Sequence, residues 1–122
     1  MFKAMIKVSV LYPRKTGSRF DVGYYTGVHM PRAAELLAQA VRQVTVEIGA
    51  SGASPEQPPA FWAIAGFTCE SVEAFSEAFL PHAAELRDDI PNYTDVEPII
   101  QISQLTELGL SPVIHAHEIR SS

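Results

Sequence analysis

The sequence predicts one α+β domain, in which a four-stranded antiparallel sheet carries two helices on one face. Two patterns predict it. Four segments have the alternation or the β-branched and aromatic composition of strands, and the segments between them repeat apolar residues at helical spacing. With 122 residues, 47% hydrophobic and 19% charged, the chain has the length of one domain and enough apolar residues for one core.

The first and third strands are the most apolar segments. Residues 4–12 are rich in β-branched and aromatic side chains, and Pro13 then ends the strand because its nitrogen carries no amide hydrogen. Residues 61–69 form a nearly continuous apolar run. Its length and composition favour a strand.

The second and fourth strands are predicted from alternation. Residues 43–48 place valine and isoleucine on one face and polar side chains on the other, which indicates a half-buried strand. Residues 95–105 alternate in a similar way, with Pro98 expected near the strand start or at an edge, where no ladder donor is needed. The even-numbered side chains of the first, second and fourth strands are expected to contact the helices. The Gly-, Ser- and Pro-rich segment 49–59 is predicted to be a long loop.

The first helix is predicted over residues 19–39. Ser18 followed by Asp21 forms a partial capping box, with Ser18 as the N-cap. Pro31 lies inside this run, and its ring clashes with the preceding helical turn. The helix is therefore expected to kink near Met30 or to divide in two.

The second helix is predicted to follow Ser71, which suits an N-cap, with Glu73 placed favourably in the first turn. Pro81 should kink this helix as Pro31 kinks the first. The segment 88–93 is predicted to end it. The buried stripe of this helix is expected to contain Val72, Phe75, Phe79 and Leu86.

The resulting order is β-α-β-β-α-β, the ferredoxin-like plan, with an antiparallel sheet and both helices on one face. The other face of the sheet is mixed in character and is left without helices. Such a face is a candidate for burial against a second copy, although an antiparallel sheet can also keep one face in water. Its predicted members include Met5, Lys7, Ser9, Leu11, Ile99, Gln101 and Ser103.

Composition also narrows the function classes. The net charge of −5 argues against binding to nucleic acid, which requires clustered Lys and Arg. The single cysteine, Cys69, forms no internal disulfide and favours a cytoplasmic location. No apolar run reaches 18 residues, so no membrane span is predicted. His115 and His117 would share one strand face, but they lack a third ligand nearby, so no metal site is predicted.

His29 is the strongest candidate for a catalytic residue, and Tyr25 is the second. His29 follows Tyr25 by four residues and precedes Pro31, so its backbone is held near a helix break. A neutral imidazole beside an apolar pocket can act as a general base or acid. The alternative is a structural histidine that bonds to a backbone carbonyl at the kink.

Other aromatic residues are candidates for ligand binding. Tyr12 and Tyr24, like Tyr25, carry hydroxyls that can bind a carbonyl or a phenol, and Trp62 and Phe67 can form an apolar wall. Packing in the core is the alternative for all of them. His82, next to Pro81, faces either the same pocket or the solvent. The chain has no Gly-rich phosphate loop and no paired-cysteine signature, so no cofactor is predicted.

Four segments together resemble the EthD family, within the dimeric α+β barrel superfamily. They are Met5–Pro13, the Phe20–Tyr25 helix start, the triplet His29-Met30-Pro31, and Asp89–Asp95 with the strand that ends at Gln104. The resemblance covers residues 5–105. It supports a division into a domain at 1–105 and a C-terminal tail at 106–122 that can pack on a partner.

The resemblance implies a homodimer in which two sheets pack face to face and the helices lie outside. Relatives hold small organic molecules between the sheet and the helices, and some relatives bind haem, for which His29 would be the ligand. The leading hypothesis is a cofactor-independent lyase, isomerase or cyclase that acts on an apolar carbonyl or aromatic compound in catabolism or secondary metabolism. The alternatives are a non-catalytic ligand-binding or accessory protein of a degradation pathway and a structural module without a pocket.

Overall fold

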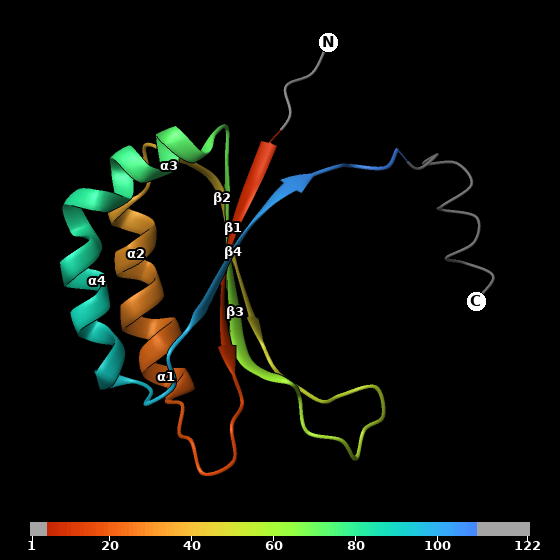
Figure 1. Cartoon of the computed structure of the whole chain (residues 1–122). Coiled ribbons are helices and arrows are strands. Elements are labelled where there is room, and N and C mark those ends of the chain that lie inside the picture. Colours follow the sequence, from red (N-terminus) through yellow and green to blue (C-terminus); the bar gives the residue numbers. More distant parts are fainter. Residues whose placement is uncertain (1–4, 110–122) are drawn as a thin grey trace.

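The computed structural model describes residues 5–109, which form a four-stranded antiparallel sheet with all helices on one face (Figure 1). The sheet order is β2-β3-β1-β4. The predicted α+β fold and its β-α-β-β-α-β order are confirmed. The strands are β1 (Met5–Pro13), β2 (Val41–Ile48), β3 (Phe61–Cys69) and β4 (Ile99–Leu105).

The helical layer consists of two broken helices that lie side by side in Figure 1. The first runs through α1 (Val22–Tyr24), a π-helix (Tyr25–His29) and α2 (Met30–Leu36). The second runs through α3 (Val72–Phe79), a 3₁₀ turn (Leu80–His82), α4 (Ala83–Asp89) and a second 3₁₀ turn (Ile90–Asn92). Within residues 5–109, no helix has the length and apolar character needed to cross a bilayer.

Proline marks each break in the helical layer, as the sequence predicted for Pro31 and Pro81. Pro31 is the second residue of α2, and Pro81 and Pro91 are the second residues of the two 3₁₀ turns. At the start of a helical segment the missing amide hydrogen costs little, because that donor has no partner within the segment. The prolines therefore divide the helices without ending the layer.

Several predicted boundaries are wrong by a few residues. The first helix begins at Val22, and its N-cap is Asp21, whose carboxylate accepts from the Tyr24 amide at 3.0 Å. Ser18, the predicted cap, instead donates its hydroxyl to the Lys15 carbonyl. The first helix also ends at residue 36 rather than 39.

Two strands also begin a few residues away from their predicted starts. β2 begins two residues earlier than predicted, at the register shift between Val41 and Gln43. β4 begins at Ile99 rather than Asp95, so Pro98 lies just before the ladder and needs no donor there. Just before this segment, Thr94 forms an isolated antiparallel bridge to Phe20.

The core lies between the sheet and the helices. Val8 and Tyr12 of β1 are buried there, as are Ala63, Ala65 and Phe67 of β3. For β4 the prediction that even-numbered side chains contact the helices is wrong in part, since Ile100 and Ile102 are 58% and 49% exposed. The helices therefore cover β1 and β3 and leave the inner face of the edge strand β4 open.

The predicted division at residue 105 stays a prediction. Residues 106–109 are described as an exposed extension after β4. The rest of the predicted tail, with His115 and His117, lies outside the described residues.

Candidate functional site

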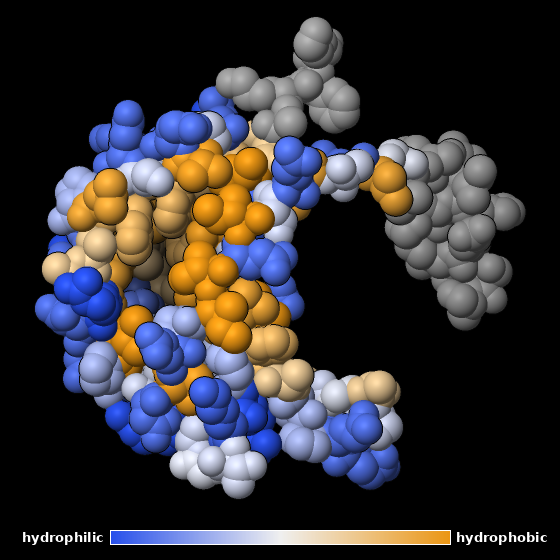
Figure 2. Space-filling view, viewed as in Figure 1, coloured by the Kyte–Doolittle hydropathy of each residue, from blue (hydrophilic) through white to orange (hydrophobic). Residues whose placement is uncertain are grey.

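A cavity of about 280 Å³ lies between the sheet and the helical layer. Val8 and Val10 of β1 and Ala65 of β3 form its floor, where a small alanine leaves room beneath the helices. Figure 2 shows a hollowed, hydrophobic region between the edge strand β4 and the helices. The edge of the cavity is formed by Pro98, which precedes β4, and by Ile100 of β4. The helical wall includes Met30, Ala33, Leu37, Phe75, Phe79, Ala83, Leu86 and Ile90.

The polar side chains at this cavity are few. Tyr12, Tyr25, His29 and Arg87 line it together with the apolar residues. The two tyrosines are at most 2% exposed, and His29 is 7% exposed, whereas the side chain of Arg87 is 70% exposed. The cavity is thus apolar, with an imidazole in its wall and a guanidinium at its solvent side.

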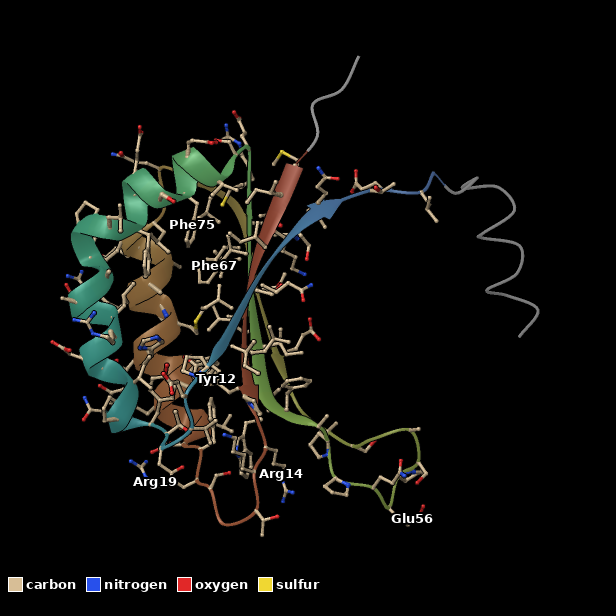
Figure 3. The ribbon with its side chains drawn as sticks, viewed as in Figure 1. Tyr12, Arg14, Arg19, Glu56, Phe67 and Phe75 are labelled. Atoms are coloured by element: carbon tan, nitrogen blue, oxygen red, sulfur yellow. The ribbon has the colours of Figure 1, made fainter. Side chains whose placement is uncertain are left out.

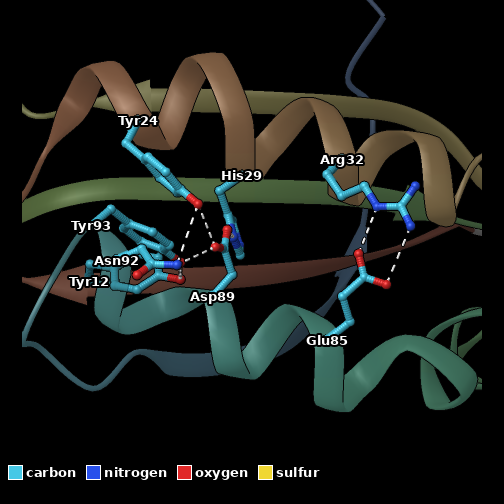
Figure 4. Close-up of polar contacts among 8 residues, drawn as sticks. All are labelled: Tyr12, Tyr24, His29, Arg32, Glu85, Asp89, Asn92 and Tyr93. Atoms are coloured by element: carbon cyan, nitrogen blue, oxygen red, sulfur yellow. Dashed lines mark hydrogen bonds and ion pairs between the residues drawn. The ribbon is translucent and has the colours of Figure 1, made fainter.

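His29 is held by a carboxylate from the other helix. Its Nδ1 lies 2.9 Å from Oδ2 of Asp89, the last residue of α4 (Figure 4). The π-helix makes this placement possible, because its wider turn, closed by the Met30 amide on the Tyr25 carbonyl, buries both Tyr25 and His29. The Tyr25 and His29 rings stack with their centroids 5.9 Å apart.

The Asp89 carboxylate accepts two further hydrogen bonds, both at Oδ1. The Tyr24 hydroxyl donates at 2.6 Å and the Asn92 amide at 2.9 Å. Burial raises the pKa of the Asp89 carboxyl, but the hydrogen bonds that it accepts outweigh burial and hold the pKa below its ordinary value. Asp89 is therefore ionised near neutral pH and can only accept, so the proton between Asp89 and His29 resides on Nδ1.

Three tyrosine side chains pack beside His29. The hydroxyls of Tyr12 and Tyr93 share a buried hydrogen bond of 2.5 Å, and the Tyr93 ring lies 4.6 Å from the His29 ring. Burial raises the pKa of Tyr12, Tyr25 and Tyr93 above the ordinary value, so all three stay neutral. Among the described residues, the Tyr25 hydroxyl is the buried side-chain polar atom that has no hydrogen-bond partner.

The structure brings four of the predicted site residues to one cavity: Tyr12, Tyr25, His29 and Phe67. Three others lie elsewhere. Tyr24 contacts Asp89 instead, and His82 lies half-buried in the 3₁₀ turn, away from the cavity lining. Trp62 lies beside the register shift at Tyr12/Pro13. Its ring stacks on Phe20 with the centroids 6.1 Å apart, and its indole N–H donates to the Ser18 hydroxyl.

Sequence reasoning missed Asp89, Asn92 and Tyr93 as parts of the site. The segment that contains them was interpreted as a helix end and as part of the EthD resemblance, without a role in the site. Their spacing of three and four residues places all three on one side of a helical turn, and that pattern could have identified them.

The opposite side of the His29–Asp89 contact is a polar groove. Val28, Arg32, Glu85 and Asp88 line it with Asp89 and others. Arg32 connects α2 to α4 through Glu85, with Nε and Oε2 2.7 Å apart (Figure 4). It also forms a hydrogen bond to Glu35. Both partners are about half exposed, so this pair adds little to stability and mainly aligns the two helices.

The haem alternative does not fit this cavity. A volume of about 280 Å³ lies at the lower end of pockets for drug-sized ligands, and a haem macrocycle is larger than such ligands. The cavity suits a small apolar molecule.

Known proteins were compared with this chain. A family model described as the EthD domain matches residues 16–97. No curated protein matches the chain. An EthD-like protein of Ralstonia eutropha JMP134 is 47% identical in sequence and has a TM-score of 0.78, with 84% of this chain and 92% of that chain covered.

Two more distant solved structures share the fold alone. An ethyl tert-butyl ether D (EthD) family protein of Bacillus halodurans C-125 is 16% identical, with a TM-score of 0.61 and coverage of 84% of this chain and 99% of that one. A hypothetical protein of Arabidopsis thaliana is 18% identical, with a TM-score of 0.55 and coverage of 90% and 97%.

Proposed function

The chain belongs to the EthD family, and from this premise we propose that it binds a small apolar carbonyl or aromatic compound and transforms it by proton transfer at His29. No cofactor takes part in the proposed step. The observation that carries the proposal is one contact, the buried imidazole of His29 held by Asp89 in the wall of an apolar cavity.

The surroundings of His29 suit a general base. A carboxylate 2.9 Å from Nδ1 fixes the orientation of the ring and stabilises the imidazolium that forms when Nε2 takes a proton. The apolar walls lower the local dielectric constant, so this charge interaction is stronger than it would be at the surface. Proton removal followed by return at another atom is an isomerase step, and proton removal with loss of a group or with ring closure is a lyase or cyclase step.

Other residues take supporting roles in the proposal. Tyr25 acts through His29, on which its ring stacks, because its own side chain is fully buried, and Tyr12 and Phe67 complete the wall. Tyr24 acts through Asp89 rather than by touching the ligand. Trp62 and His82 do not line the cavity and are given no role.

A ligand-binding protein without catalysis is the second candidate. The cavity alone favours it, because an apolar pocket with few polar groups retains small molecules whether or not they react. The two candidates differ in their dependence on His29. Binding needs only the shape and apolar walls of the cavity, whereas turnover needs the base.

The test measures by NMR the rate at which deuterium from D₂O enters the carbon positions of apolar ketones and phenols, taken as a panel. We expect the protein to accelerate exchange at carbon for some members, and His29→Gln to reduce that rate by about 10²-fold or more, the usual contribution of a general base. His82→Gln is the matched control and should keep the full rate. Exchange by His29→Gln at the original rate, with an unchanged melting temperature, would falsify the catalytic role.

We further propose that the protein is a cytoplasmic homodimer that pairs through the outer face of the sheet. Leu11 lies between Ile64 and Ile99 in the ladder, and the three share that outer face. The helices lie on the opposite face and do not cover this triplet (Figure 1). Cys69 is free and buried, which is compatible with a reducing compartment.

A further inference from the structure

We infer that the cavity recognises its ligand as a hydrogen-bond donor, so that the ligand class is an apolar phenol rather than a compound that only accepts. The inference rests on the proposed function and narrows it. It follows from one polar atom, Nε2 of His29, and from the aromatic wall that faces the same space.

The other polar groups at the cavity are unavailable or lie at its solvent side. The Tyr12 hydroxyl is already bonded to Tyr93, and the side chain of Tyr25 is fully buried beneath the cavity surface. Arg87 is largely exposed and lies near Asp88, with Nε and Oδ1 3.7 Å apart. His29 is therefore the polar side chain that a ligand meets inside the cavity.

Asp89 determines which nitrogen of the His29 ring can accept a hydrogen bond from a ligand. Its Oδ2 can only accept, so Nδ1 carries the hydrogen, and in the neutral imidazole Nε2 is then a bare acceptor. Within residues 5–109, no hydrogen bond to Nε2 is formed, and this nitrogen is not among the fully buried polar atoms without a partner. A ligand group that satisfies Nε2 has to donate.

The wall that faces His29 suits an aromatic ring. Phe75 stacks on Phe79 with centroids 5.5 Å apart, and Phe67 is tilted against Phe75 at 6.0 Å. All three line the cavity. In Figure 3 Phe67 and Phe75 lie toward one end of the space between sheet and helices, and Tyr12 lies toward the other. A flat ring can pack on the phenylalanines while its hydroxyl points to the imidazole.

The chemistry of such a complex is a balanced proton transfer. The phenol O–H bond breaks, its electron pair stays on oxygen, and the proton forms a bond to Nε2. The resulting imidazolium lies between the aryloxide and the Asp89 carboxylate. Return of the proton to a ring carbon gives the keto tautomer, so this step is a tautomerisation that requires no oxidant.

The first test compares two probes of nearly equal shape, 2-naphthol and 2-methoxynaphthalene, by fluorescence titration. We expect the wild-type protein to bind 2-naphthol at least tenfold more tightly, since only this probe donates. In His29→Leu the two affinities should become equal. Equal affinities in the wild type would overturn the inference while the proposed binding function stands. If neither probe binds, both fail.

The second test uses the geometry at Asp89 and does not depend on removing His29. Tyr24 and Asn92 both donate to Oδ1, so in Asp89→Asn the amide oxygen should take that place and the NH₂ group should face Nδ1. Nε2 then carries the hydrogen. We expect imidazole ¹⁵N NMR shifts of His29 to report this tautomer and the preference for 2-naphthol to fall below about twofold. A retained preference with the changed tautomer would contradict the inference.

Discussion

The two faces of the sheet have opposite organisation. On the inner face, buried aromatic rings from four segments contact one another, and a polar cluster of Asp89, His29 and Tyr24 connects the two broken helices. On the outer face, the side chains are half-buried or exposed, and Lys7 lies across Gly66, where a glycine leaves room for its chain. The inner face is covered by helices of its own chain, whereas these helices leave the outer face uncovered.

The two faces of the sheet therefore differ in the side chains that they present. The inner face keeps a cavity because Ala65 is small and because the helices do not extend over β4. The outer face offers Leu11, Ile64 and Ile99 in one row across three strands. Substitutions on the inner face are expected to act on stability and chemistry, and those on the outer face on association.

The largest expected effect is on the inner face. Tyr93→Ala removes a fully buried ring that contacts Tyr12, Tyr25 and His29, and it leaves the Tyr12 hydroxyl without its partner. We expect a loss of about 3–5 kcal/mol in the free energy of unfolding, measured in urea. Gln101→Ala on the outer face should cost about 0.5 kcal/mol or less. Equal losses in the free energy of unfolding for the two variants would contradict the expected difference between the two faces of the sheet.

A charge on the outer face should change the oligomeric state. Leu11→Lys places an ammonium group between Ile64 and Ile99, where pairing of two sheets would desolvate it. We expect light scattering after gel filtration to report a dimer for the wild type and a monomer for the variant.

Leu80→Lys is the matched control for that substitution. Leu80 is 69% exposed in the 3₁₀ turn of the helical layer, so the same change of residue leaves the outer face intact. The control should remain dimeric. A monomeric wild-type protein at micromolar concentration would refute pairing through this face.

The smallest effect is a pH dependence on the inner side. The pKa of Asp89 is lower in the folded chain than in the unfolded chain, so the unfolded state binds more protons as the pH falls through the range near 4. The contribution of Asp89 to stability is complete above the unfolded-state pKa and is lost below it. Between pH 5 and pH 3 the wild type should lose more free energy of unfolding than Asp89→Asn. Parallel urea-unfolding curves for the two proteins would show that Asp89 contributes nothing.

The sequence by itself determined the elements that depend on neighbouring residues. The bounds of β3 match the apolar run 61–69, and Ser71 caps α3 by accepting from the Ala74 amide at 3.0 Å. The breaks at Pro31 and Pro81 follow from one missing amide hydrogen and one ring clash each. Propensity, alternation and capping act over a few residues, and a single sequence displays them directly.

Only the tertiary structure decided how the site is assembled. His29 and Asp89 are 60 residues apart, and Tyr12 and Tyr93 are 81 apart, so no local pattern indicates that they meet. The packing of the two broken helices gives His29 its carboxylate, and Phe20 and Thr94 meet in an isolated bridge. Such contacts depend on the geometry of the whole layer, because each is formed by elements that pack only after the sheet has brought them together.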